Sequence, residues 1–244
     1  MAAAGHSPLE QFTIHRLIPI HIGRLDLSYT NAALLMTLAV ALATLLLVAA
    51  TARAALVPRR LQSVAELLYE FVAGMVRDNV GEEGRRYFPL VFSIFVFILF
   101  GNLLGLVPYS FTFTGQIIVT FALALFVFLF VTVLALIRHR IRFFTFFFPP
   151  GALIVMAPLL VPIEIISYLT RPVSLSLRLF ANMLAGHTMF AVFAGFTVAL
   201  GLFGFLPLAF NVALLALEVV INLLQAYVFA ILTCLYLSDA IHLH

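Results

Sequence analysis

The sequence contains little charge, no tryptophan and no lysine. Charged residues make up 9% of its 244 residues. Because lysine is absent, the 13 residues counted as lysine or arginine are all arginines. A soluble domain is about 25% charged. The single cysteine, Cys234, excludes an internal disulfide and a cysteine-based metal cluster. Apolar residues account for 64% of the chain, which excludes a soluble globular protein and predicts an all-α membrane protein with one integral membrane domain, residues 1–244.

The apolar runs set the expected spans. A helix of about 20 apolar residues crosses a bilayer, and we predict about five such helices, at 31–50, 88–107, 117–137, 152–200 and 206–238. Residues 1–29 form an N-terminal tail in which we expect no cleaved signal. Between the first two spans, residues 61–80 carry Glu66, Glu70 and Arg77 at helical spacing among apolar residues. This pattern predicts an amphipathic helix at the membrane interface.

The last two runs are too long for ordinary spans. About 40 helical residues reach about 60 Å, which is twice the hydrocarbon thickness of about 30 Å. Either each run is interrupted, or the helices are long and tilted. Prolines could kink the first run without ending it. Polar residues along both runs favour long, tilted helices that form a channel.

The distribution of arginines predicts the orientation of the chain. With five spans, only Arg16 and Arg24 lie on the side of the N-terminus. The excess on the other side predicts that the N-terminus is outside and the C-terminus inside, and it explains the arginines better than a nucleic-acid surface does. The nine arginines that would share the inner side are Arg53, Arg59, Arg60, Arg77, Arg85, Arg86, Arg138, Arg140 and Arg142.

Each of the last two runs carries a polar stripe, since residues seven apart lie on nearly the same face of a helix. On the first run the stripe consists of Glu164, Ser167, Arg171, Ser174, Arg178 and Asn182. On the second it consists of Asn211, Glu218, Asn222 and Gln225. We expect the two polar faces to meet each other or a partner subunit.

Arg178 is the strongest candidate for a functional residue. Its guanidinium stays protonated, and no acidic residue lies between Glu164 and Glu218 to neutralise it. Charges inside a membrane are costly and mark ion pathways, which applies to Glu218 as well. His187 lies nine residues beyond Arg178, on the opposite face of the helix, so spacing alone leaves packing and function equally open for it.

Other polar residues have simpler explanations. Ser174, Ser176, Asn211 and Asn222 could equally be hydrogen-bonding links between helices. A snorkelling side chain is the simplest explanation of Arg171, and Tyr168 could simply pack against its neighbours. We expect the residues near the C-terminus, Asp239, His242 and His244, to be solvated. No phosphate-binding loop, catalytic triad or metal-binding spacing occurs in the sequence, and we expect no cofactor and no metal.

Three segments resemble subunit a of rotary F-type ATP synthases. They are SYLTRPVSLSLRLFANMLAGH at 167–187, INLLQAYVFAILTCLYLSDA at 221–240 and GNLLGLVPYSFTFTGQ at 101–116. The resemblance runs from about residue 60 to the C-terminus. It implies a non-catalytic, proton-translocating stator subunit with two offset half-channels. The partners it implies are a ring of c subunits, b-type peripheral stalk subunits, the rest of the complex and the bilayer.

The resemblance also assigns roles to individual residues. Arg178 matches the family's essential arginine, which meets each ring carboxylate and separates the half-channels. Glu164 and Ser167 match the inner path. His187 and Glu218 exchange the Glu and His of some bacterial relatives, and such an exchange preserves a proton-carrying pair if the two residues are neighbours. The predicted proton-path residues are Arg178, Glu164, Ser167, Asn182, His187, Glu218, Asn222 and Gln225.

Two rival interpretations are a self-contained channel or secondary transporter and a structural membrane scaffold. A transporter commonly shows repeated halves, and we find no repeat. A scaffold would not need Arg178 or Glu218. Arginine-rich and alanine-rich usage, with no presequence apparent, predicts a bacterial inner (plasma) membrane, with a mitochondrial inner membrane as the alternative.

Overall fold

The computed structural model describes residues 13–22, 25–26, 28–52, 55, 57–107, 111–140, 143 and 156–242. Among these residues, five helices are long and apolar enough to cross a membrane, which confirms the predicted all-α membrane fold. The long helices are α1 (Asn31–Thr51), α2 (Arg60–Val80), α3 (Phe88–Gly105), α4 (Ile117–His139), α5 (Ala157–Ala199) and α6 (Phe205–Ile241). Short 3-10 helices lie at η2 (Glu82–Tyr87), η3 (Phe113–Gly115) and η6 (Gly201–Gly204).

The N-terminal segment is more ordered than a simple tail. Strand β1 (Arg16–Ile18) pairs antiparallel with β4 (Tyr29–Thr30), and β2 (His21–Ile22) pairs antiparallel with β3 (Leu25–Asp26). The Thr30 hydroxyl accepts a bond from the Ala33 amide and so caps α1. The Asn31 side chain donates to the Thr13 carbonyl at 3.1 Å. These bonds attach the segment to the start of α1.

Helix α1 packs on α3 through small residues. The buried positions of α1 are Ala32, Ala39, Ala43 and Ala50, at spacings of seven, four and seven. Small residues on one stripe let two membrane helices approach closely. The larger side chains of α1, such as Leu45 and Val48, are exposed on its other side.

The expected helix at 61–80 is present as α2. Its buried positions, which include Val72 and Val76, pack into the core with α3 and α6. Leu61, Val64 and Leu67 follow one another at helical spacing and are 55%, 47% and 68% exposed. An exposed apolar stripe on a charged helix fits a helix that lies against lipid, so the interfacial position remains our prediction for α2.

The core lies where α3 crosses α6, with α2 and α4 on either side. Helix α3 contributes large side chains, and α6 contributes small ones that let α3 come close. The fully buried members include Val91, Ile98, Ala226, Phe229, Ala230 and Cys234. The span predicted at 88–107 is present as α3, which begins at Phe88 and ends at Gly105.

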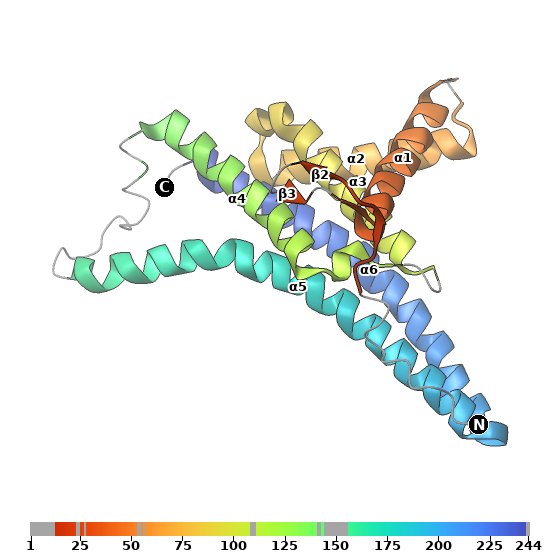
Figure 1. The fold of residues 1–244 in the computed structure, drawn as a ribbon. Helices are drawn as coiled ribbons and strands as arrows, with labels where there is room; N and C mark the ends of the chain where they lie inside the picture. Colours follow the sequence, from red (N-terminus) through yellow and green to blue (C-terminus); the bar gives the residue numbers. More distant parts are fainter. Residues whose placement is uncertain are drawn as a thin grey trace.

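Helices α5 and α6 are both continuous, so the alternative of an interruption is wrong for the described part of each. Helix α5 has 43 residues and encloses Pro162 and Pro172, while α6 has 37 residues. Each proline removes one helical hydrogen bond, and a helix at such a site bends without ending. Figure 1 shows α5 as a curved rod, with α6 beside its second half. Residues 152–155 lie outside the described part, and the tilt of both helices remains a prediction.

The turn between α5 and α6 depends on two glycines. Gly201 has a φ of 52°, a left-handed value that favours glycine. Gly204 lies against the Thr197 carbonyl, where a side chain would collide with backbone. The turn folds α6 back along α5, so residues near the C-terminal end of α5 face the first half of α6.

Candidate functional site

Arg178 lies at the midpoint of α5, with 21 residues of the helix on either side. Its side chain is exposed, next to the exposed apolar side chains of Val173 and Leu177. Among the described residues, no hydrogen bond or ion pair reaches its guanidinium. Within the part of the chain that the structure describes, Arg178 therefore has no acidic partner. The side chain faces outward and is available to a group from outside the chain.

Asn182 lies one turn after Arg178 and connects α5 to α6. Its Nδ2 donates to Oε1 of Gln225 at 2.8 Å. Gln225 is buried, with 4% of its surface exposed, and its Nε2 has no hydrogen-bond partner among the described residues. The sequence placed these two amides on the facing polar stripes, and the structure brings them into contact.

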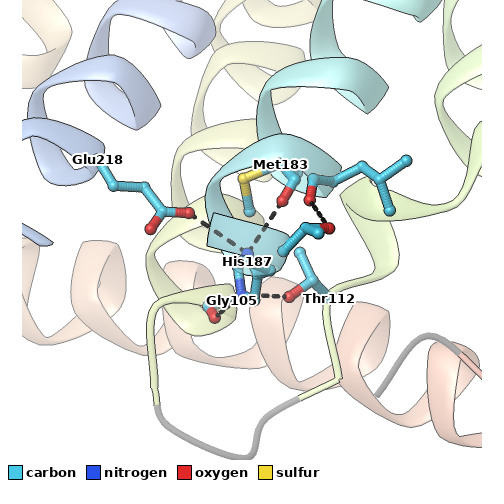
Figure 2. A network of polar contacts seen from close by, with 7 residues as sticks. Gly105, Thr112, Met183, His187 and Glu218 are labelled. Carbon is cyan, nitrogen blue, oxygen red and sulfur yellow. Dashed lines mark hydrogen bonds and ion pairs between the residues drawn. The ribbon is translucent and has the colours of Figure 1, made fainter. Parts of the chain in front are cut away.

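His187 and Glu218 are neighbours, as the exchange hypothesis requires. Nδ1 of His187 lies 3.3 Å from Oε1 of Glu218, and both side chains are buried. Figure 2 shows the imidazole of α5 facing the carboxylate of α6. Gly186 leaves room for this contact, because an added Cβ there would lie 2.5 Å from Oε1 of Glu218. The pair is one buried acid–base unit between the two long helices.

Both ring nitrogens of His187 also face oxygen atoms of the backbone. Nδ1 lies 3.0 Å from the Met183 carbonyl, and Nε2 lies 2.8 Å from the Gly105 carbonyl. Nε2 is also 3.0 Å from Oγ1 of Thr112, in the segment before η3 (Figure 2). The sequence analysis missed Gly105, Thr112 and Met183, because a backbone carbonyl and a loop threonine carry no distinctive signal.

A row of buried polar atoms continues from Glu218 along α6. Asn102 of α3 donates through Nδ2 to the Asn222 carbonyl at 3.2 Å. Buried polar atoms normally bond to protein or to water, so the free members of this row can accept or donate bonds to water. Oε1 of Glu218 faces His187, at 3.3 Å from its Nδ1. Among the described residues, the other buried side-chain atoms without a hydrogen-bond partner are Oδ1 of Asn102, Oγ1 of Thr114, Oδ1 of Asn211, Oε2 of Glu218, Nδ2 of Asn222 and Nε2 of Gln225.

Arg171 has a different environment from the one we expected. Its Nη1 lies 2.8 Å from Oδ2 of Asp239, and its Cζ lies 5.2 Å and 5.1 Å from the ring centres of Tyr168 and Tyr236. Asp239 keeps 42% of its side chain exposed, so it is solvated as expected and also paired with Arg171. The snorkelling of Arg171 stays a prediction. Tyr168 packs as expected, and its hydroxyl also bonds to Oγ1 of Thr132 at 2.7 Å. Arg171 connects α5 to the last turns of α6.

Glu164 and Ser167 lie in the first half of α5, away from the other predicted residues. Glu164 is half-buried and Ser167 is exposed. Within the described ranges, no hydrogen bond or ion pair joins the side chain of either one to another predicted site residue. The same ranges contain no group of three His, Cys, Asp or Glu side chains that could hold a metal ion.

The sequence matches the family model described as ATP synthase A chain over residues 33–238. It is similar to proteins named ATP synthase subunit a in three bacteria. With the protein of Rhodospirillum rubrum it shares 55% identity over 240 residues, which cover 98% of this chain and 100% of the relative. With the protein of Paramagnetospirillum magneticum it shares 54% identity over 245 residues, which cover 98% of this chain and 99% of the relative. With the protein of Mesorhizobium japonicum it shares 53% identity over 249 residues, which cover 99% of each.

Proposed function

Because the chain belongs to the family of ATP synthase A chains, the proton-translocating component of the membrane sector, we propose that it forms two offset half-channels separated by Arg178. In this proposal the chain is a stator subunit without a catalytic site. Its partners are a rotating ring of c subunits, b-type stalk subunits and the rest of the ATP synthase complex. Proton flow through the half-channels turns the ring, and ATP is made in the soluble sector.

The order of groups along α5 is the observation that carries this proposal. Glu164 precedes Arg178 by 14 residues, and His187 follows it by nine. In a continuous helix these separations correspond to about 21 Å and about 14 Å. The two ionisable groups therefore lie on opposite sides of the arginine along one helix. Two proton paths that end at these groups are offset, and the arginine stands between them.

The entry path runs along the buried row of α6. His187 and Glu218 receive protons from the outer side, and Asn222 and Gln225 follow on the same face of α6. Glu218 and Gln225 are seven residues apart, or about 10 Å. Gln225 bonds to Asn182, which lies one turn from Arg178. Water bonded to the free amide atoms would complete the path to the ring carboxylate.

The exit path runs through Glu164 and Ser167 toward the inner side. The excess of arginines on the loops of that side orients the chain, with the N-terminus outside and the C-terminus inside. Together with the bacterial relatives, this orientation supports a position in a bacterial inner membrane. The half-buried carboxylate of Glu164 accepts the proton that the ring carboxylate releases.

The charge of Arg178 keeps the two proton paths separate. An exposed guanidinium at mid-helix attracts the ionised form of a ring carboxylate and repels protons. Arginine suits this role better than lysine, because a desolvated lysine can lose its charge. Each proton that crosses about 100 mV releases about 2.3 kcal/mol. A leak past Arg178 would dissipate this energy, so the barrier between the paths is part of the coupling.

Replacement of Arg178 tests the proposal. We expect that Arg178→Ala abolishes ATP synthesis and ATP-driven proton pumping in membrane vesicles, while the subunit still inserts. The matched control is Arg77→Ala, at a side chain that is 74% exposed on α2, and it should keep both activities. Normal pumping by the Arg178→Ala complex would contradict the proposal. Proton conduction by this chain reconstituted without the ring would favour the self-contained channel instead.

A further inference from the structure

Residues on either side of the connection between α3 and α4 contact the imidazole of His187. Gly105 ends α3, and Thr112 precedes η3, which packs against α5. Thr112 is 1% exposed, and both its hydroxyl and the Gly105 carbonyl lie within 3.0 Å of Nε2 of His187. In Figure 2 both groups approach the same edge of the ring. Two contacts from one segment therefore converge on Nε2.

The chemistry of these contacts determines which nitrogen carries a fixed proton. A carbonyl oxygen only accepts hydrogen bonds, so Nε2 must carry a hydrogen at 2.8 Å from the Gly105 oxygen. The Thr112 hydroxyl can accept a second, shared bond from the same hydrogen. The Gly105 carbonyl also belongs to the C-terminal end of α3, whose partial negative charge favours a positive ring. Both groups hold Nε2 in its protonated form.

The opposite edge of the ring is where a proton can move. Nδ1 faces the Met183 carbonyl and Oε1 of Glu218, the ionisable side chain of α6 that contacts the imidazole. A bare Nδ1 would set its lone pair against the Met183 oxygen, so this edge also favours a proton. Two arrangements keep the hydrogen on Nε2. An imidazolium beside a carboxylate satisfies all the contacts, whereas a neutral ring that accepts a proton from a carboxylic acid gives up the hydrogen bond to the Met183 carbonyl.

We infer that Thr112 and the Gly105 carbonyl are positioning groups that fix the protonated Nε2 of His187, so that the proton the pair exchanges lies between Nδ1 and Glu218. The inference rests on the proposed proton-carrying role of this pair. The proton passes from Nδ1 to Oε1, and the ring and the carboxylate both become neutral. Protons then do not cross the ring from one nitrogen to the other. They enter and leave through Glu218, whose Oε2 has no other partner among the described residues.

The test uses the whole complex in liposomes, where ATP synthesis is measured at constant membrane potential while the pH of the proton-entry side is varied. Thr112→Val removes the hydroxyl and keeps the shape of the side chain. We expect its pH profile to move by about half to one pH unit toward lower pH, since one hydrogen bond to the charged ring is lost. Thr112→Ser keeps a hydroxyl and should restore most of the profile.

Two controls separate the possible failures. Thr120 is a buried threonine of α4 whose hydroxyl bonds to carbonyls of its own helix, so Thr120→Val should leave the profile unchanged. A pH midpoint does not depend on the amount of active complex, and reduced assembly of Thr112→Val therefore leaves the measurement valid. An unchanged midpoint in Thr112→Val, or equal shifts in the Val and Ser variants, overturns the positioning role. If Glu218→Gln leaves synthesis unchanged, the proposed function of the pair has failed instead.

Discussion

Gly186 provides a sharp test of how closely His187 and Glu218 must approach. A Cβ added at Gly186 would lie 2.5 Å from Oε1 and 2.8 Å from Cδ of Glu218. Non-bonded carbon atoms prefer about 3.5 Å or more, so the carboxylate of a Gly186→Ala variant must move by about 1 Å. A shift of this size directed away from His187 would lengthen the distance between Oε1 of Glu218 and Nδ1 of His187 from 3.3 Å to about 4.3 Å. A displacement of this size can cost about a hundredfold in rate.

The fold should tolerate this change well. Alanine is a better helix former than glycine by about 1 kcal/mol, and the group that must move is the end of a flexible side chain. We therefore expect Gly186→Ala to insert and assemble normally, while the rate of proton-driven ATP synthesis falls by about ten- to a hundredfold. The measurement is the synthesis rate of inverted membrane vesicles, divided by the amount of the subunit in the purified complex.

A matched glycine on the same helix serves as the control. Gly195 has no atom within 4 Å of an added Cβ, so Gly195→Ala should synthesise ATP at the normal rate. Glu218→Asp shortens the carboxylate side chain, and combining it with Gly186→Ala should recover part of the rate. A wild-type rate in Gly186→Ala would show that the measured separation of His187 and Glu218 does not limit proton entry.

Two further predictions concern the contacts between α5 and α6. Asp239→Ala leaves Arg171 without its carboxylate partner. It should lower the stability of the purified complex by about 1 kcal/mol, a small loss because the pair is only partly buried. If the losses of Asp239→Ala and Arg171→Gln simply add in the double variant, the two side chains do not interact. Asn182→Ala leaves Oε1 of the buried Gln225 without a donor. It should reduce synthesis about tenfold at normal assembly, and unchanged rates would remove this contact from the proton path.

The spans were predictable because hydrophobic length is a strong signal. The runs at 31–50 and 117–137 correspond to α1 and α4 within two residues at each end. Whether α5 is interrupted was not predictable, since a proline within a helix can either end it or bend it. The outcome depends on tertiary packing: α6 contacts α5 on both sides of Pro172, through Asp239 at Arg171 and Gln225 at Asn182.

The contacts among the residues of the proposed proton paths were predictable to different degrees. Heptad spacing was enough to place Asn182 and Gln225 on facing stripes, and the structure joins them by one hydrogen bond. For His187, spacing gave no decision between packing and function, because the position of Glu218 depends on how α6 turns back at η6. The exchange with relatives made contact a condition for a proton-carrying pair, and the 3.3 Å separation of the two side chains meets that condition.

The contacts that sequence reasoning missed have a common cause. Asp239 lies 68 residues from Arg171, and nothing in either local pattern predicts that they meet. The Gly105 carbonyl is free because it lies in the last turn of α3, where carbonyls lack helical partners. Such groups become functional through the tertiary fold alone, so the sequence carries no trace of their role.

The outward charge of Arg178 also affects how a copy of the chain behaves before it meets its partners. By insertion scales, an arginine at the centre of a membrane helix costs about 3 kcal/mol, which corresponds to about a hundredfold in an equilibrium. A free copy bears this cost at its lipid-facing surface, whereas a carboxylate beside the guanidinium would remove much of it. The residue that we propose to separate two proton paths would thus also make the unassembled subunit less stable than the assembled one, and this difference would give quality control in the membrane a physical basis for recognising orphan copies.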